Sequence, residues 1–281
     1  MTLRARLLCL AAALLFSTGG AVIKGTALTG WQIASFRSGV AALAIFALVP
    51  ASRRPSPLAW LVGIAYAVTM VLFVVANTLT TAAHTAFLQA TAPLYLLLLG
   101  PLLLKERARR ADVLLLLPMG IGLSLLLLGA GEAQATAPRP ALGNALGLVT
   151  GLSWACTLIG MRALGKRGES SMTAVVAGSV LACLVALVPA LTADELLLDA
   201  SACFAVLWLG VFQIALAYVF LARGVRHLPA LEVSLLLLLE PVASPGWAWF
   251  FHGEKPTGLA LTGGALILAV SALRFVRRPE D

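Results

Sequence analysis

The chain consists almost entirely of apolar stretches long enough to cross a lipid bilayer. A helix needs about 20 apolar residues to span the hydrocarbon core. Such stretches run at about 5–23, 30–50, 58–79, 82–104, 112–130, 141–163, 171–191, 202–222, 229–251 and 257–275. Only short connections remain between them in a chain of 281 residues. The sequence therefore predicts one compact membrane bundle without a sizeable soluble domain.

These stretches are expected to be helices. Lipid offers no hydrogen-bond partner to exposed backbone groups, and the period-two alternation typical of strands is absent. Only 11% of the residues are charged, whereas a soluble domain carries roughly 25%. No ordinary water-facing surface can be built from this composition. We predict an all-α membrane protein with ten transmembrane helices.

The basic residues indicate how the helices are oriented. With the N-terminus inside, sixteen of the twenty lysines and arginines fall in cytoplasmic stretches, and only Lys24, Arg139 and Lys255 fall on the outer side. Arg37 remains, inside a helix. Cytoplasmic loops carry an excess of Lys and Arg, so both termini are predicted to be cytoplasmic. The membrane orientation therefore explains why the chain carries an excess of basic residues, with a net charge of +8. Nucleic-acid binding is not expected, because the basic clusters are short and form no extended face.

The two halves of the chain resemble each other. The pentapeptide ALVPA occupies residues 47–51 and recurs at residues 186–190. Further matches pair Phe16 with Trp154, Lys24 with Arg162, Trp60 with Trp208, Pro93 with Pro241 and Glu106 with Glu254. The offset between partners grows from 138 to 148 residues and never decreases along the chain. We therefore predict a repeat, with a first unit at residues 1–138 and a second at residues 139–281.

An odd number of spans in each unit makes the repeat inverted. Five helices per unit place the second unit upside down relative to the first. Inverted repeats are the architecture of secondary transporters, in which one half rocks against the other and exposes a site between them to each side in turn. The first stretch could pass for a cleaved signal peptide. We expect it to be retained, because it completes the first unit of the repeat.

The ninth apolar stretch carries a motif that resembles a known family. Leu239, Glu240 and Pro241 are followed by Glu254 and then by a helix rich in glycine. This pattern resembles the EamA family of the drug/metabolite transporter superfamily, and the likeness extends over the whole chain. The resemblance implies a basket-like bundle of five plus five helices that exports amino acids and related metabolites. It also implies that the Glu-Pro pair has an architectural role.

Arg37 is a candidate for substrate binding. It lies about eight residues into the second apolar stretch, where a charge costs several kcal/mol unless it is paired or reaches water. One interpretation is a cavity residue that holds a substrate carboxylate. The alternative is an arginine that snorkels to the outer surface or binds helix-end carbonyls.

Glu240 and two prolines are further candidates. Glu240 lies near the middle of the ninth stretch, where a buried carboxyl can change its charge and couple transport to protons. The alternative is a protonated or paired glutamate that supports a kink. Pro93 and Pro241 are predicted to break the fourth and ninth helices at matched depths, since each removes a backbone donor. Glu106 and Glu254 are expected to cap neighbouring helices.

Other polar and aromatic residues lie inside the predicted core or at its outer entrance. An apolar pocket with a few orienting polar atoms is typical of small-molecule sites. Including Arg37, the candidate cavity residues are Arg37, Tyr66, Phe73, Asn77, His84, Gln89, Tyr95, Trp154, Gln213 and Tyr218. Packing alone is the alternative for each of them. Gly143, Gly147 and Gly151 form a small-residue face on one helix, which we expect to pack inside the bundle rather than between two copies.

The functional hypothesis follows from these patterns. We find no phosphate-binding loop, no catalytic nucleophile with a base and no metal-ligand spacing, so we expect neither an enzyme nor a cofactor or metal. We expect a secondary carrier of the inner membrane that moves amino acids or similar amphipathic metabolites outward, as a monomer in the lipid bilayer. A membrane-embedded enzyme, a channel and a scaffold are the alternatives. Facilitated diffusion, exchange and proton coupling are all compatible with the sequence.

Overall fold

The computed structural model describes a helical bundle. It covers residues 2–80, 82–106, 110–129, 139–193, 199–252 and 257–276. No strand occurs in this part of the chain, so the all-α prediction is confirmed there. The helices of the first half are α1 (Thr2–Ser17), α2 (Gly19–Lys24), α3 (Gly30–Leu48), η1 (Pro50–Ser52), α4 (Pro57–Leu79), α5 (Ala82–Gln89), α6 (Ala92–Leu104) and α7 (Arg110–Gly129). Those of the second half are α8 (Pro140–Lys166), α9 (Met172–Leu191), α10 (Ala200–Leu207), η2 (Trp208–Leu216), α11 (Ala217–Val225), α12 (Ala230–Leu237), α13 (Leu239–His252) and α14 (Gly258–Val276).

Seven helical segments of the described chain are long and apolar enough to cross a membrane. They are Thr2–Ile23, Gly30–Leu48, Pro57–Leu79, Thr85–Leu104, Ala141–Lys166, Met172–Leu191 and Ala200–Val225. The other three predicted spans correspond to α7, to α12 with α13, and to α14. Of these, α7 and α14 contain shorter apolar segments, Val113–Leu125 and Leu261–Val270. The multi-span membrane fold is thus confirmed, and the count of ten remains a prediction.

Several predicted spans consist of more than one helix. α1 is followed by α2 after Thr18, and α12 is followed by α13 after Leu238. Two residues separate the end of α5 from the start of α6. Pro93 and Pro241 lie in the first turns of α6 and α13, where a missing backbone donor costs little. The breaks therefore lie just before the prolines, and each proline begins the second helix of its pair.

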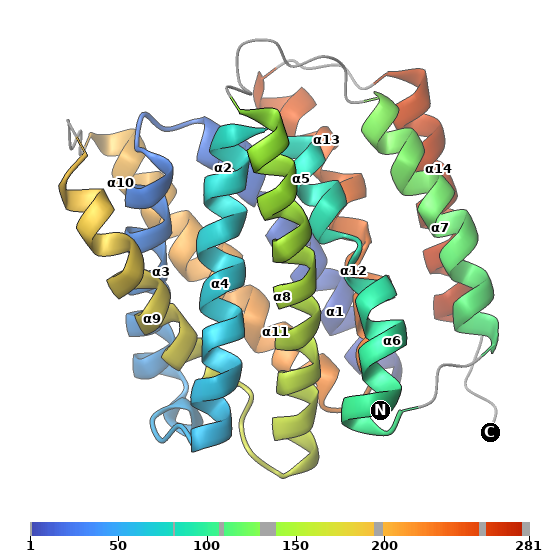
Figure 1. Ribbon diagram of the computed structural model, residues 1–281, viewed down its shortest axis with the longest axis horizontal. Coiled ribbons are helices and arrows are strands. Elements are labelled where there is room, and N and C mark those ends of the chain that lie inside the picture. Colours follow the sequence, from blue (N-terminus) through green and yellow to red (C-terminus); the bar gives the residue numbers. More distant parts are fainter. Residues whose placement is uncertain are drawn as a thin grey trace.

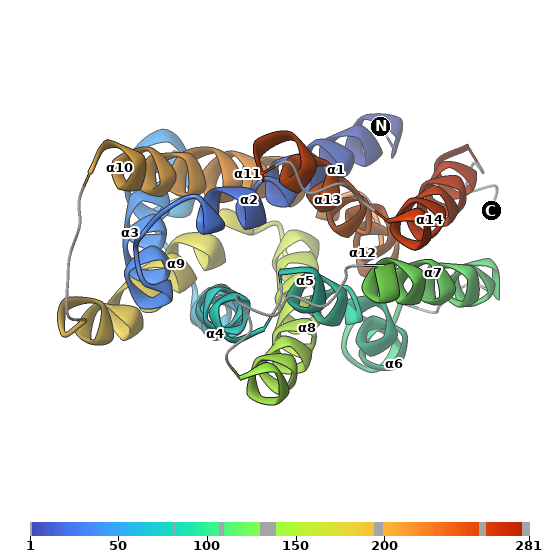
Figure 2. The same ribbon diagram turned by 90° about the horizontal axis from the view of Figure 1, so that it is seen from above.

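The helices stand side by side across the bundle (Figure 1). Seen from above, α10, α11 and α1 follow one long side, whereas α9, α4, α8 and α6 follow the other (Figure 2). α1 packs against α11, α3 against α9, α4 against α8 and α9, and α7 against α14. Each of these contacts joins a helix of the first half to a helix of the second. The core therefore lies between the halves.

Glycines allow the closest of these contacts. A Cβ on Gly178 of α9 would lie 2.6 Å from the carbonyl oxygen of Gly63 in α4. On α8, a Cβ on Gly143 would contact Thr80, and one on Gly147 or Gly151 would contact Leu88. The small-residue face of α8 thus packs inside the bundle, as expected.

Candidate functional site

Arg37 lies at the centre of the core. Its side chain projects from α3 and is fully buried, with 0% of its surface exposed. Nη1 donates a 3.3 Å hydrogen bond to Oε1 of Gln213, and Nη2 donates a 3.1 Å hydrogen bond to the carbonyl oxygen of Met70. Nε is buried and has no hydrogen-bond partner among the described residues. Full burial argues against the snorkelling alternative.

The local sequence explains how a guanidinium fits at this depth. α3 is rich in small residues, and Ser35 donates a 3.0 Å hydrogen bond from Oγ to the carbonyl oxygen of Cys183 in α9. Close helix contact of this kind excludes both lipid and water from the α3 face. A Cβ on Gly210 would lie 2.9 Å from the carbonyl oxygen of Arg37, so η2 also approaches α3 closely. Small residues therefore allow α9 and η2 to approach α3 closely on either side of Arg37 in the sequence.

Gln213 is brought to Arg37 by an irregular helix. It belongs to η2, a π-helical segment that joins α10 to α11. Stretches of π-helix are rare and occur often at functional sites. Gln213 itself packs on the first residue of α2, since a Cβ on Gly19 would lie 2.9 Å from its Nε2. The amide thus connects Arg37 to the break that follows α1.

Four aromatic rings surround this polar centre. Tyr66 of α4 and Tyr218 of α11 meet edge to face, with ring centroids 5.0 Å apart. Phe16 of α1 lies 5.2 Å from the Tyr218 ring and 6.1 Å from the ring of Trp154 in α8. The Tyr66 hydroxyl accepts a 3.2 Å hydrogen bond from Oγ of Ser179. The Tyr218 hydroxyl is buried and has no partner in the described part of the chain.

Together these side chains form a largely aromatic cluster that contains a few buried polar atoms. We call Arg37, Gln213, Tyr66, Tyr218, Trp154 and Phe16 the central cluster. Two of its polar atoms, Nε of Arg37 and Oη of Tyr218, are buried without described partners. Buried polar groups are nearly always hydrogen-bonded. A ligand with acceptor and donor oxygens would satisfy both.

Glu240 lies close to the central cluster. It is half-buried in the first turn of α13. Its helix packs against α1, which carries Phe16 of the central cluster, and the described structure contains no ion pair between Glu240 and Arg37.

No hydrogen bond or aromatic contact in the described part of the chain joins the remaining candidate residues to the central cluster. Asn77 is buried in α4 and donates a 2.9 Å hydrogen bond from Nδ2 to the carbonyl oxygen of Phe73 on its own helix. Phe73 is buried in the apolar core, and Tyr95 is half-buried against it. Gln89 ends α5, and its Oε1 is buried without a described partner. The backbone of His84 belongs to α5, but its side chain lies outside the described residues. Glu254 also lies outside them.

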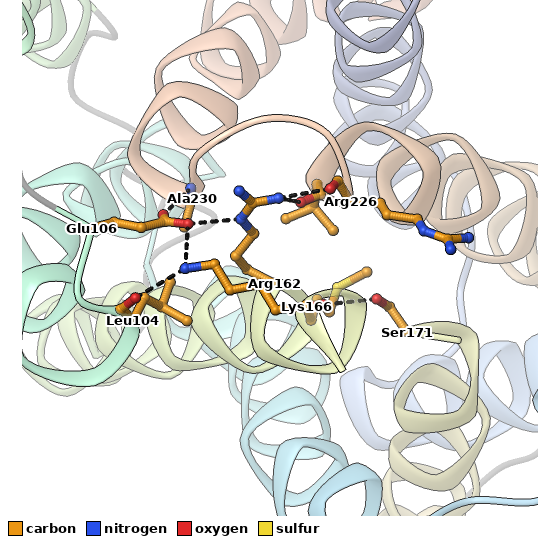
Figure 3. Close-up of polar contacts among 9 residues, drawn as sticks. Leu104, Glu106, Arg162, Lys166, Ser171, Arg226 and Ala230 are labelled. Carbon is orange, nitrogen blue, oxygen red and sulfur yellow. Dashed lines mark hydrogen bonds and ion pairs between the residues drawn. The ribbon is translucent and has the colours of Figure 1, made fainter. Parts of the chain in front are cut away.

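A cluster of charged residues joins four elements at one end of the bundle (Figure 3). Oε1 of Glu106, just after α6, accepts a 2.8 Å hydrogen bond from Nε of Arg162 and lies 2.9 Å from Nζ of Lys166. Oε2 accepts a 3.3 Å hydrogen bond from the backbone N–H of Ala230, the first residue of α12. Glu106 thus caps a neighbouring helix, as expected. Arg162 also donates from Nη1 to the carbonyl oxygens that end α11.

Electrostatics favour the charged form of Glu106. Burial alone would raise the pKa of this carboxyl. The hydrogen bonds from Arg162 and Lys166 outweigh burial and hold the pKa below its ordinary value. The group therefore remains a carboxylate at neutral pH, and it ties α6, α8 and α12 together at this end.

Among the described residues, no group of three or more His, Cys, Asp and Glu side chains is placed to hold a metal ion. The model of the EamA-like transporter family matches residues 3–128 and 141–275. The chain belongs to the EamA-like transporter family. Membership of this family indicates that the protein is a membrane transporter rather than an enzyme.

Two curated proteins and one solved structure resemble this transporter. Both proteins are the pseudopaline exporter CntI of Pseudomonas aeruginosa, from strains UCBPP-PA14 and PAO1. Each is 27% identical to this chain, and each alignment covers 93% of this chain and 92% of the relative. A crystal structure matches with a TM-score of 0.79 at 23% identity, covering 96% of this chain and 95% of the other. That likeness shows that the two chains share a fold.

A buried charge pair in this transporter was not predicted from the sequence. Arg6 of α1, which we assigned to a cytoplasmic stretch, is 4% exposed and donates a 2.8 Å hydrogen bond from Nε to Oε1 of Glu232 in α12. Both side chains lie at helix ends in the sequence, so nothing in the local pattern distinguishes them from interfacial charges. Glu232 lies in the first turn of α12, and the one indication in the sequence is that a carboxylate so near an apolar run needs a partner.

Proposed function

We propose that this chain is a secondary transporter that exports small metabolites bearing a carboxylate, such as amino acids, across the inner membrane. The observation that carries the proposal is the fully buried Arg37, whose described partners are an amide and a backbone carbonyl. A guanidinium in such a site costs several kcal/mol unless an anion neutralises it. A carboxylate can accept from the unpartnered Nε and from an adjacent donor in a bidentate geometry.

The aromatic residues of the central cluster suit the rest of such a substrate. Phe16, Tyr66, Trp154 and Tyr218 supply ring faces and edges around Arg37. Apolar walls with a few orienting polar groups are typical of small-molecule sites. An amphipathic metabolite, with an aromatic or aliphatic part beside its carboxylate, would fit both features.

Alternating access between two inverted five-helix halves is the mechanism that we propose. Corresponding helices support this repeat: α5 and α12 both have eight residues and begin 148 residues apart. The starts of α7 and α14 are also 148 residues apart. Phe16 and Trp154, which correspond in the repeat, meet in the core. Side chains related by a two-fold axis meet only where they lie next to that axis. The central cluster would then lie between the halves, where inverted-repeat transporters bind their substrates.

Ten spans with both termini cytoplasmic complete this proposal. The positive-inside distribution of Lys and Arg supports this orientation, and the Glu106 cluster would then close the cytoplasmic end. The curated relatives are exporters of a small metabolite, pseudopaline. Their names support outward transport of a metabolite by this chain as well.

Transport by purified protein in liposomes tests the proposal. We expect saturable uptake of at least one labelled amino acid or of pseudopaline, inhibited by compounds that keep the carboxylate and unaffected by analogues in which it is an amide. If no carboxylate-bearing metabolite moved under any imposed gradient, the proposed substrate class would be wrong. Continuous, non-saturable flux would instead indicate a channel.

Glu240 is the candidate for coupling transport to protons. It is half-buried, and the described structure shows no ion pair for it. We expect a proton gradient to drive wild-type transport and to have no effect on the Glu240→Gln variant. Transport by Glu240→Gln that kept its full pH dependence would assign Glu240 to support of the break between α12 and α13.

A further inference from the structure

A basic cavity lies away from the central cluster, between the start of α1 and the end of α11. Its volume is about 360 Å³, and it is lined by Arg4, Ala5, Leu8, Arg223 and His227. α1 and α11 lie side by side along one long side of the bundle (Figure 2). They approach closely because Gly224 has no side chain, and a Cβ there would overlap Sγ of Cys9. The cavity lies next to this contact, since Ala5 of α1 and Arg223 of α11 both line it.

The charges of this cavity have one sign. Arg4, Arg223 and His227 are exposed side chains, and no carboxylate lines the cavity. The described structure contains no ion pair for either arginine. The acidic residue that packs on this part of α1, Glu232, lies on another face of the helix, where it binds Arg6. Two arginines with free donors can hold a phosphate oxygen from two sides.

An apolar stripe begins beside the cavity. Leu3, Leu7 and Leu14 of α1 are 56%, 52% and 46% exposed. With 3.6 residues per turn, these three share one face of α1, and that face adjoins the face of Arg4. A stripe of exposed leucines on a membrane-spanning helix is a surface for acyl chains. Cationic donors and an acyl-chain surface are thus continuous, as a phospholipid requires and a free phosphate does not.

We propose that this cavity binds the head group of an anionic phospholipid, with the phosphate held by Arg4 and Arg223 and the acyl chains along Leu3 and Leu7. Basic pockets between membrane helices on the cytoplasmic side bind anionic head groups in this manner. Because α1 belongs to the first half of the chain and α11 to the second, the bound lipid would join the two halves at this end. The lipid would stabilise the arrangement in which α1 and α11 are in contact.

Lipid binding to the purified full-length protein tests the proposal. Native mass spectrometry would count phosphatidylglycerol and phosphatidylcholine molecules retained during titration in detergent. We expect one tightly held phosphatidylglycerol, no comparable phosphatidylcholine, and affinity for phosphatidylglycerol about 30-fold lower in the double variant Arg4→Gln/Arg223→Gln. The matched control is Arg54→Gln/Arg167→Gln, which removes two exposed arginines with the same change of net charge and should bind phosphatidylglycerol as the wild type does.

Two further measurements distinguish the outcomes. Leu8→Trp fills the cavity without changing the charge, and we expect it to lose the lipid while the protein keeps its thermal unfolding temperature in detergent. Displacement of phosphatidylglycerol by millimolar inorganic phosphate would show that the cavity holds a soluble anion and would overturn the lipid assignment. Equal lipid binding by the wild type and the double variant would show that the cavity is not the binding site.

Discussion

Arg37 and Gln213 are joined by a 3.3 Å hydrogen bond between Nη1 and Oε1, which links α3 of the first half to η2 of the second. The amide of Gln213 is neutral, so it satisfies a donor of the guanidinium without neutralising its charge. A carboxylate that entered the core would form stronger, charge-assisted hydrogen bonds. It would compete with Gln213 for Arg37, and binding would loosen a contact between the halves.

Substitution of Arg37 should weaken substrate binding far more than folding. We expect Arg37→Gln to raise the KM for a carboxylate-bearing substrate roughly 10- to 100-fold, because a hydrogen bond to a charged group contributes about 1.5–3 kcal/mol. Uptake into proteoliposomes at several substrate concentrations measures this effect. Arg37→Lys keeps the charge but not the planar guanidinium. Its KM should lie between those of the wild type and of Arg37→Gln. Unchanged KM in Arg37→Gln would remove Arg37 from the binding site.

Ablation of the Tyr218 hydroxyl tests the second unpartnered atom of the central cluster. Tyr218→Phe keeps the ring that packs on Phe16 and Tyr66, and it removes a buried hydroxyl without a described partner. We expect the variant to be as stable as the wild type and to bind substrate about 5- to 10-fold more weakly, since a neutral hydrogen bond contributes about 1 kcal/mol. A stabilised variant with unchanged KM would show that the hydroxyl has no part in binding.

Much of the fold follows from hydrophobicity and charge, because a membrane restricts a chain to few structures. The apolar stretches predict where the helical segments lie, although several of these segments are divided into shorter helices. The charge of Arg37 within an apolar stretch points to a residue that the structure places in the core. The break between α1 and α2 and the π-helix at Gln213 could not be predicted. Both depend on how neighbouring helices pack, since Trp208 donates to Thr18 across these two elements. Apolar periodicity carries no information about such contacts.

Acid should selectively weaken the contact made by Glu106. The pKa of this group is lowered on folding, so its stabilising effect is complete above the unfolded pKa of about 4.3. The effect is lost as the pH falls through the lower, folded value. We expect Glu106→Gln to unfold about 2–4 °C below the wild type at pH 7, for a loss of about 1 kcal/mol. This difference in unfolding temperature should persist down to about pH 4 and disappear as the pH falls further. Glu169→Gln, a carboxylate with no described ion pair, controls for net charge.

The pair of Arg6 and Glu232 should show strong energetic coupling. Both side chains are 5% exposed and lie 2.8 Å apart, so removal of one leaves a buried charge without its counter-ion. We expect Arg6→Met and Glu232→Met each to cost about 3–5 kcal/mol, and the double variant to cost less than either one. Equilibrium unfolding of the four proteins in mixed micelles measures this cycle. Additive effects of the two substitutions would show that the pair contributes no mutual stabilisation.

Gly178→Ala should separate α9 from α4 and disturb the central cluster. The new Cβ would lie 2.6 Å from the carbonyl oxygen of Gly63 and also against the ring of Tyr66. Overpacking of this kind costs about 1–3 kcal/mol, and the displaced ring would also lower the rate of transport. Gly100→Ala is the matched control, because a Cβ there would lie more than 4 Å from any packing neighbour. Alanine is the better helix former, so the control should be at least as stable as the wild type. Equal unfolding temperatures for the two variants would show that α4 and α9 tolerate a wider separation than their close contact indicates.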